Sequence, residues 1–403
     1  ARSLYDVLPY LVPGLNESYA LHGSREGGVS LVVEGVDNNN LLFYGSPITT
    51  GPNPDSVGEI SVVTNSKAEA GRNMGGVINV GIKSGTPEYH GNYRQFYRTT
   101  NLNATSFFNN EQGIPKDKRI TNRMGGQIGG PVIIPKIYNG RARTFFFIDY
   151  EAAREAEDET AIFDVPTLAQ RTGDFSALPS TLWPKDPLTG VKFPGGIIPA
   201  DRIHPIAQWF LENLIPAPNS GESDYYRNAD QRSVGHQITF RTDHQLTPRS
   251  SLNVSYVTNL TKGISGSTST LYYDIRSFYR NQNLSIKHRK DFGPGITNTL
   301  ILGYTRYKYQ AFMGHAALTG YDLEEIGFRG WSPTHFYALS TPKVRIGDPF
   351  TLTVSSCYPV APRRSNNYQA KDDMAVVAGS HRLKFGFDVR WYNLKESWSS
   401  NPS

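Results

Sequence analysis

The chain has 403 residues, of which 12% are aromatic and 19% charged, together with 38 glycines and 26 prolines. This composition favours β-strands and long loops over helices. The net charge of +5 comes from 41 basic and 36 acidic residues scattered along the chain, without the Lys/Arg run that marks a nucleic-acid-binding surface. The single cysteine, Cys357, cannot form an internal disulfide. No stretch approaches the roughly 20 apolar residues of a membrane helix.

The first 87 residues are predicted to form a compact α+β domain. A short helix is expected over Leu4–Leu11, ended by Pro13-Gly14. Strands are expected at Ser18–Gly23 and at Val29–Val36.

A polar loop, VDNNN, follows the second of these strands. Its residues Asn38, Asn39 and Asn40 favour turns, because their side chains bond to nearby backbone groups. The same amides are candidate contacts for a hydrophilic ligand. A solvated turn without a ligand is the alternative.

The stretch Val57–Gly85 predicts two further strands, Ile60–Thr64 and Val77–Ile82, joined by a glycine-rich turn. Glycine serves where φ must be positive or where two backbones approach closely. We therefore expect Gly71, Gly75 and Gly76 to be hinge or packing positions. An ordinary hairpin in a soluble β-domain has the same pattern.

From Glu88 onward the sequence alternates between apolar and polar residues. In His381–Leu394 one face carries Leu, Phe, Phe, Val and Trp, while the other carries Lys, Gly, Asp, Arg and Tyr, a period of two that predicts a strand. Similar segments are Tyr89–Tyr97, Asn122–Ile134, Arg143–Ala153, Val234–His244, Ser251–Thr258, Asn283–His288, Thr299–Tyr304, where the phase slips near Arg306, and, more weakly, Asn367–Val377. The aromatic residues near strand ends, candidates for membrane-interface girdles or for a core, are Tyr304, Tyr307, Tyr309, Trp391 and Tyr392.

The connections between these strands alternate in length. Short turns are expected at Thr247–Ser251, Asp291–Thr297 and Ala378–His381, whereas the connections at about 156–233, 261–278 and 310–366 are long. Short turns at one rim and long loops at the other are typical of transmembrane β-barrels, whose strands show lipid only every second side chain. The longest connection is expected to fold as an extracellular lobe with a helix at Pro205–Leu214, forming a substrate mouth or a structural cap.

Five blocks resemble, in matching order, the Oar-like branch of TonB-dependent outer-membrane transporters, whose members usually carry a carboxypeptidase-regulatory-like domain at the N-terminus. The blocks are AEAGRNMGGVINV at the end of the first domain, NRMGGQIGGPVIIPK, RTFFFIDYEAARE, VPTLAQRTGDFS and GGIIPADRIHPIAQWFLENLIPAPN. In addition, LVVEGVDNNN resembles an earlier strand and loop of the family's plug domain. The resemblance covers nearly the whole chain.

The resemblance implies a mainly β fold, with an N-terminal α+β plug at 1–87 and, at 88–403, the N-terminal part of a transmembrane β-barrel with its long loop at about 156–233. About nine or ten strands of a barrel of about 22 are expected. The implied function is plug-gated uptake, or export, of a large or scarce substrate across the outer membrane of a Gram-negative bacterium. The implied partners are outer-membrane lipid and the TonB–ExbB–ExbD complex, which would engage a segment N-terminal to residue 1.

No catalytic pattern stands out. His236 and His244 have neither zinc-helix nor zinc-finger spacing, and GxSxG, P-loop and HExxH motifs are absent from the sequence. Asp372-Asp373 indicates a turn, with a calcium site as the alternative. We therefore expect no enzyme activity, no cofactor, no metal and no nucleic-acid partner. A surface adhesion or carbohydrate-binding protein is the alternative function, and it would bury the apolar strand faces between two sheets; a signalling receptor on the same scaffold has the same sequence pattern.

Overall fold

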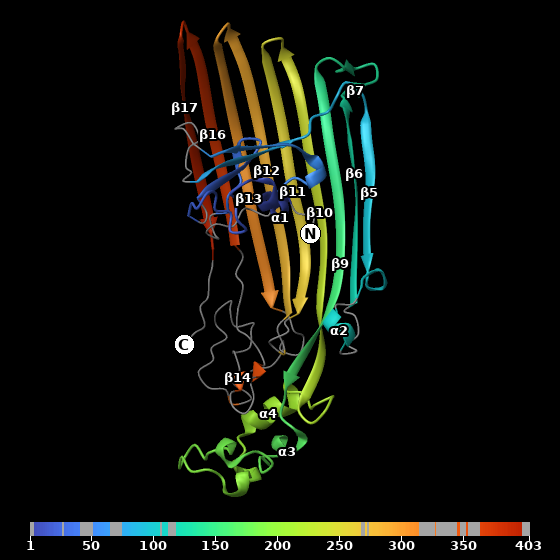
Figure 1. The fold of residues 1–403 in the computed structure, drawn as a ribbon, viewed down its shortest axis with the longest axis vertical. Coiled ribbons are helices and arrows are strands. Elements are labelled where there is room, and N and C mark those ends of the chain that lie inside the picture. The colour runs from blue at the N-terminus through green and yellow to red at the C-terminus, as the bar shows by residue number, and fades with distance from the viewer. Residues whose placement is uncertain are drawn as a thin grey trace.

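Two sheets dominate the fold, which was determined as a computed structural model (Figure 1). It describes residues 4–25, 28–40, 51–64, 75–104, 107–111, 118–266, 271, 274–313, 327, 345–346, 352–353 and 363–396. A nine-stranded sheet, here called the wall, curves around a four-stranded sheet near the N-terminus, here called the plug. Among the described residues, no helix has the length and apolar character needed to cross a membrane.

The wall is antiparallel throughout, in the order β17-β16-β13-β12-β11-β10-β9-β6-β5. Its strands are β5 (His90–Thr99), β6 (Lys118–Pro131), β9 (Thr144–Asp164), β10 (Asp224–Thr247), β11 (Ser250–Gly266), β12 (Asp274–Gly293), β13 (Ile296–Met313), β16 (Arg363–Ala378) and β17 (His381–Lys395). Every strand predicted after Glu88 is present, most of them longer than expected. The change of phase in the apolar pattern near Arg306 does not interrupt the strand, because β13 pairs with β12 in unbroken register from Thr297 to Met313. Asp372 and Asp373 lie in β16, not in a turn.

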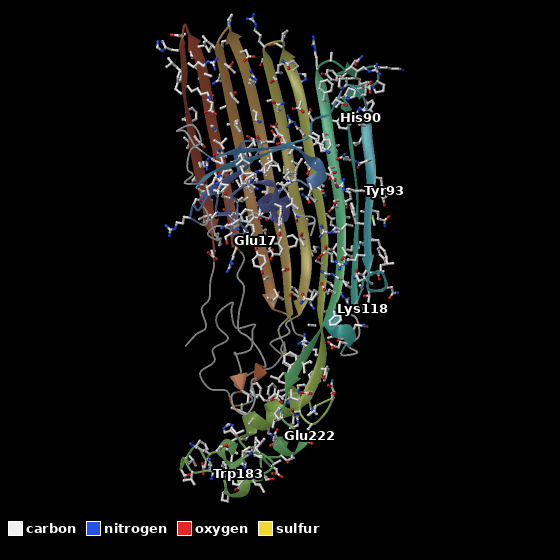
Figure 2. The ribbon with its side chains drawn as sticks, viewed as in Figure 1. Glu17, His90, Tyr93, Lys118, Trp183 and Glu222 are labelled. Carbon is white, nitrogen blue, oxygen red and sulfur yellow. The ribbon has the colours of Figure 1, made fainter. Side chains whose placement is uncertain are left out.

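Short turns join the wall strands at one rim, at the top of Figure 1. They connect β10 to β11, β12 to β13 and β16 to β17, as predicted. At the opposite rim the strands extend further than the sequence indicated, since β9 runs to Asp164 and β10 begins at Asp224. Figure 2 labels His90 towards the short-turn rim and Lys118 towards the other.

The two faces of the wall differ as the alternation in β17 predicts. Leu383, Phe385, Phe387, Val389 and Trp391 are between 54% and 69% exposed, so no second layer of protein covers them. The opposite face of the wall carries the plug. The outward apolar face excludes a sandwich, in which these side chains would meet another sheet.

The plug packs its strands in the order β2-β1-β4-β3, with β1 and β4 parallel and the other pairs antiparallel. Its elements are α1 (Leu4–Leu11), β1 (Val29–Val33), β2 (Val36–Asp37), the 3₁₀ turn η1 (Pro54–Ser56), β3 (Val57–Val63) and β4 (Gly76–Ile82). The core combines Leu8, Leu31, Val33, Ile78 and Val80 with other apolar side chains of the plug, and Phe147 and Val257 of the wall join it. The plug is thus docked on the wall by apolar as well as polar contacts.

Two expectations for the plug are wrong. Residues 18–23 form turns, with one isolated bridge from Leu15 to Leu21, because Tyr19 and His22 adopt positive φ. The strand expected at Val29–Val36 is interrupted by a two-residue turn. Glu34 (φ 51°) and Gly35 (φ 83°) make this turn, and two successive positive φ values reverse the chain into a hairpin.

The lobe, residues 165–223, extends from the ends of β9 and β10 (Figure 1). It contains α3 (Leu168–Arg171), η4 (Ser180–Leu182), η5 (Pro194–Gly196), η6 (Ala200–Arg202) and α4 (Pro205–Asn213), the last close to the helix predicted at Pro205–Leu214. Phe163, Val165, Phe210, Leu214 and Ile215 belong to its apolar cluster. Figure 2 labels Trp183 within the lobe.

The remaining elements are short. They are η3 (Thr100–Leu102), α2 (Phe107–Glu111), β7 (Ile133–Ile134), β8 (Tyr138–Asn139), β14 (Arg345–Ile346) and β15 (Leu352–Thr353).

Candidate functional site: the plug–wall interface

The plug presents a carboxylate to the wall at the tip of the β1–β2 hairpin. The tight turn at Glu34 and Gly35 brings the backbone close to β12 and β13, where the Ser285 hydroxyl donates to the Glu34 carbonyl at 3.1 Å. Glycine suits the second position, because a φ of 83° is one that side-chain-bearing residues rarely adopt. The turn therefore fixes the Glu34 side chain between wall strands.

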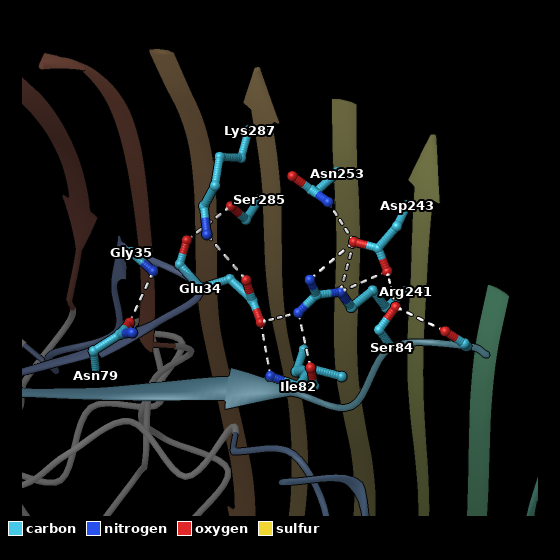
Figure 3. A network of polar contacts seen from close by, with 11 residues as sticks. Glu34, Gly35, Asn79, Ile82, Ser84, Arg241, Asp243, Asn253, Ser285 and Lys287 are labelled. Atoms are coloured by element: carbon cyan, nitrogen blue, oxygen red, sulfur yellow. Dashed lines mark hydrogen bonds and ion pairs between the residues drawn. The ribbon is translucent and has the colours of Figure 1, made fainter. Parts of the chain in front are cut away.

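Glu34 is buried, at 5% exposed, and its carboxylate has partners on both oxygens (Figure 3). Oε1 accepts from Arg241 Nη1 at 2.7 Å and from the Ile82 backbone N–H at 2.7 Å. Oε2 accepts from Lys287 Nζ at 3.1 Å. A buried carboxylate needs such partners, because desolvation otherwise penalises the charged form.

Arg241 links this carboxylate to a second one on its own strand. Its guanidinium donates to both oxygens of Asp243, at 2.8–3.0 Å, and to the Ile82 carbonyl at 2.8 Å. Asp243 also accepts from the Ser84 hydroxyl at 2.5 Å and from the Asn253 amide. The network of Figure 3 therefore ties the end of β4 and the segment after it to three wall strands.

Asp37 forms a second contact site, on the other side of the hairpin. It is 1% exposed, and its backbone and side chain together bond to wall residues on β13, β16 and β17. The shortest bonds are those from Tyr392 Oη to Asp37 Oδ2 and from Thr305 Oγ1 to the Asp37 carbonyl, both 2.7 Å. The other partners are Asn367, Gln369 and Arg390.

A third contact site lies where η1 meets β5 and β9. Asn53 Nδ2 donates to Glu151 Oε2 at 2.6 Å. Arg94 Nε lies 3.1 Å from Asp55 Oδ2 in the plug, and the same guanidinium makes a two-bond contact with Asp149 at 2.7 and 2.8 Å. The three sites span the wall from β5 to β17 and orient the plug on its concave face.

The asparagines of the VDNNN loop lie beside this interface. Asn38 is fully buried and its Nδ2 donates to Tyr5 Oη at 2.6 Å, while burial raises the pKa of the Tyr5 phenol. Asn39 Oδ1 accepts from the Leu31 backbone N–H at 3.1 Å, and Asn40 is 8% exposed. The structure thus gives Asn38 and Asn39 partners within the plug, and ligand contact by these residues stays a prediction.

The glycines expected at hinge positions divide into two groups. Gly71 lies outside the described residues. Gly75 directly precedes β4 and Gly76 is its first residue, with a φ of 142° that side-chain-bearing residues rarely adopt. A Cβ on Gly76 would lie 2.7 Å from Leu21 Cδ2 and 2.8 Å from the Val63 carbonyl oxygen, and one on Gly75 would collide with Ser24. Both positions are closely packed; a hinge role stays a prediction.

Sequence reasoning missed the charged residues of the interface. A signal was present in LVVEGVDNNN, because Glu34 and Asp37 are charges embedded in an otherwise apolar strand segment. Their wall partners occupy the polar face of each strand. A girdle or a core position was predicted for the aromatic residues near strand ends. Trp391 is 69% exposed on the outward face, whereas Tyr307 is 4% exposed and Tyr392 bonds to Asp37, so the last two face the plug side and not the membrane.

Residues 81–403 match the family model of an outer membrane beta barrel domain. The chain belongs to this family. As an outer-membrane β-barrel protein it is located in the Gram-negative outer membrane, with the exposed apolar face of β17 turned to lipid. The nine wall strands do not close on themselves, so they form part of a barrel.

Relatives of this outer-membrane β-barrel protein include transporters. A "TonB-dependent transporter Oar" from Myxococcus xanthus is 28% identical over 148 residues, which cover 34% of this chain and 14% of that protein. The outer membrane transporter YddB from Escherichia coli has a similar structure, with a TM-score of 0.53 and 11% identity, over 94% of this chain and 43% of that one. A ferric enterobactin receptor, PfeA, from Pseudomonas aeruginosa matches with a TM-score of 0.46, 14% identity and the same coverage.

The chain therefore spans less than half the length of each of these three relatives. The likeness to YddB shows a shared fold for the plug and the wall together, since it covers 94% of this chain. Within the described ranges, no three His, Cys, Asp or Glu side chains are grouped as metal ligands would be. The absence of a metal and of enzyme activity stays a prediction.

Proposed function

We propose that this chain is the plug and part of the wall of a plug-gated outer-membrane transporter. One observation carries the proposal: the four-stranded sheet near the N-terminus lies on the concave side of a membrane wall and is held there at three polar contact sites. A domain in this position obstructs the lumen. Passage of a substrate then requires the plug to move or to rearrange.

The chemistry of the interface suits a movable plug. Most of its named contacts are hydrogen bonds and ion pairs, and a protein hydrogen bond contributes only about 0.5–1.5 kcal/mol net because water replaces it. Glu34, Arg241, Asp37 and Arg390 can therefore be hydrated when the plug shifts. An interface built only from apolar side chains would expose its whole area to water instead.

The energy for this movement is proposed to come from the TonB–ExbB–ExbD complex. The Oar relative is named as TonB-dependent, and the five sequence blocks resemble that branch. The outer membrane itself holds no nucleotide pool, so work on the plug has to be transmitted from another compartment. The substrate is proposed to be large or scarce, and the direction of transport is either import or export.

Ionic current through the full-length protein in planar bilayers tests the gating role, with potassium chloride as the probe. The intact protein should conduct little, and deletion of residues 1–87 should produce a large, steady current. Heat-modifiable migration on gels checks that the deletion variant has folded. A folded variant that conducts no more than the intact protein would refute gating by this domain.

A cysteine tether distinguishes plug movement from plug presence. A Cβ on Gly303 would lie 2.6 Å from Val36 Cγ1, so Val36→Cys with Gly303→Cys, in a Cys357→Ser background, places two Cβ atoms near the separation of a disulfide. In a urea concentration that opens the reduced protein, the oxidised protein should stay closed. Each single cysteine variant should behave as the reduced form under both conditions.

The adhesion or carbohydrate-binding alternative lacks support from the wall. It requires the apolar strand faces to be buried between sheets, whereas those of β17 are exposed. The lobe remains a candidate for substrate or partner contact on the transporter.

A further inference from the structure

Four basic side chains form a continuous row across four neighbouring wall strands. The hydrogen-bonded register pairs Arg280 of β12 with Lys308 of β13, Lys308 with Arg364 of β16, and Arg364 with Lys395 of β17. We call these four residues the basic row. Neighbouring strands lie about 4.8 Å apart, so the row extends for about 14 Å.

The basic row lies on the outward face of the wall. Arg280, Arg364 and Lys395 are exposed, whereas Tyr307 and Ser365, which precede or follow row members in sequence, are buried on the plug side. Because side chains alternate along a strand, the row shares its face with the exposed apolar residues of β17, here called the apolar belt: Leu383, Phe385, Phe387, Val389 and Trp391. The row is therefore directed towards the membrane, away from the lumen.

The arrangement is unfavourable for the protein alone. Like charges directly opposite one another on adjacent strands are destabilising. On the outward face of β11, β12, β13, β16 and β17, as far as the structure describes them, the row and the two register rows beside it contain no Asp or Glu. Lys308 lies over the Phe278 ring at 5.7 Å, which is an aromatic contact and supplies no anion.

A fifth cation adds to the same patch. Arg306 lies on the outward face one register row closer to the apolar belt, opposite Gln282 and Asn366. Its Nε is shielded from solvent and has no hydrogen-bond partner. A shielded guanidinium nitrogen without an acceptor costs free energy, which a bound anion would recover.

The level of the row in the membrane follows from the outward residues of β17 and its neighbours. The apolar belt ends at a group of three aromatic side chains. The ring centroids of Tyr304 and Tyr368 are 5.2 Å apart, and those of Tyr368 and Trp391 are 5.9 Å apart. Aromatic girdles mark the boundary between hydrocarbon and headgroups. The row follows four residues later, from Trp391 to Lys395, which is about 13 Å along the strand. It lies towards the rim that carries the lobe, at headgroup depth.

We propose that the basic row binds the phosphates of a membrane lipid in the leaflet on the lobe side, a lipid that carries at least two phosphate groups. Arginine donates two parallel hydrogen bonds to a phosphate, and lysine adds a point charge. A row of about 14 Å is longer than one phosphate requires, so a bis-phosphorylated headgroup fits it better than a singly charged one. The bound lipid would neutralise the like charges of adjacent strands and fix the depth of this side of the wall.

Native mass spectrometry of the full-length protein, exchanged into bis-phosphorylated lipid A, monophosphorylated lipid A or phosphatidylcholine, tests the proposal. The intact protein should retain bis-phosphorylated lipid A at least tenfold more than phosphatidylcholine. The variant Arg280→Gln/Lys308→Gln/Arg364→Gln should retain at least tenfold less bis-phosphorylated lipid A than the intact protein. The matched control, Arg289→Gln/Lys290→Gln/Arg382→Gln, removes the same charge at the short-turn rim and should change retention less than twofold.

Three results would overturn the proposal. Equal retention of bis-phosphorylated lipid A and phosphatidylcholine by the intact protein would refute the proposal. This comparison needs no variant, so the proposal can be tested even if the triple variant fails to fold. Equal losses in the two triple variants would show unspecific charge attraction. Displacement of the lipid by millimolar inorganic phosphate would show a site for free phosphate, not for a lipid.

Discussion

Glu34 of the plug accepts a 2.7 Å hydrogen bond from Arg241 of the wall, across 207 positions of the chain. Their side chains are 6% and 18% exposed, so water screens the pair only weakly. Because Lys287 contacts the second oxygen, one plug carboxylate is held between β10 and β12. This geometry fixes the rotation of the β1–β2 hairpin on the wall.

Neutralising this carboxylate should loosen the plug. In Glu34→Gln, Lys287 loses its carboxylate partner and Arg241 keeps only Asp243, and breaking a buried pair costs about 3–5 kcal/mol. The urea concentration at which ionic current appears should fall accordingly. Glu17→Gln, a change at an exposed residue elsewhere in the plug, should leave it unchanged. A midpoint unaffected by Glu34→Gln would show that the pair does not hold the plug.

Asp37 and Tyr392 should be energetically coupled, because Tyr392 Oη donates to Asp37 Oδ2 at 2.7 Å. The variants Asp37→Asn and Tyr392→Phe, singly and together, form a double-mutant cycle. Residues in one hydrogen-bond network show interaction energies of about 0.5–3 kcal/mol, so the double variant should be less destabilised than the sum of the singles. The same urea midpoint measures each member. Strict additivity would mean that the bond contributes nothing to docking.

Gly76 should tolerate no side chain. Gly76→Val forces a branched residue into a φ of 142° and against Leu21 and the Val63 carbonyl, and strained backbone alone costs about 1–3 kcal/mol. Gly23→Val is the matched control, because Gly23 has a φ of 74° but nothing within 4 Å of its Cβ position. The urea midpoint should fall further for Gly76→Val than for Gly23→Val. Equal midpoints would show that the loss of stability comes from the backbone conformation alone and not from packing.

The lobe should lose stability in acid at Asp186. The Leu188 backbone N–H, at 2.9 Å, and Arg202 Nη2, at 2.7 Å, donate to its carboxylate and lower the Asp186 pKa below its ordinary value of 3.8. A lowered folded-state pKa gives stabilisation that is complete above pH 3.8 and disappears as the pH falls through the folded value. Pepsin cleavage within the lobe should therefore rise below about pH 4 in the intact protein. Above this range pepsin should cleave the lobe of Asp186→Asn faster than that of the intact protein, and the increase in the cleavage rate on acidification should be smaller for the variant. Identical profiles of cleavage rate against pH would contradict the prediction.

The sequence predicted the wall better than the plug, for a physical reason. A strand exposed to lipid on one face has to alternate, so β17 could be recognised from its own residues. The β1–β2 hairpin could not, because its turn places Glu34 at positive φ, a conformation that the residue type does not indicate. The segment at 18–23 was misassigned for the same reason, since Tyr19 and His22 also adopt positive φ.

The candidate site was only partly accessible from sequence. Asn38, Asn39 and Asn40 were predicted as ligand contacts because a run of amides is conspicuous; the structure places them next to the interface, and ligand contact stays a prediction. Asp37 was passed over although its main partner, Tyr392, lies on a strand whose two faces were assigned correctly. No local pattern connects residues 355 positions apart; only the docking of the plug does so.

Strands β9 and β10, with 21 and 24 residues, are much longer than a bilayer requires. At about 3.3 Å per residue, 24 residues measure about 80 Å, against an apolar band about 25 Å tall. The surplus forms a hydrogen-bonded two-stranded ribbon that carries the lobe away from the membrane. A large molecule that approaches from that side meets Trp183 and its neighbours before it reaches the membrane surface.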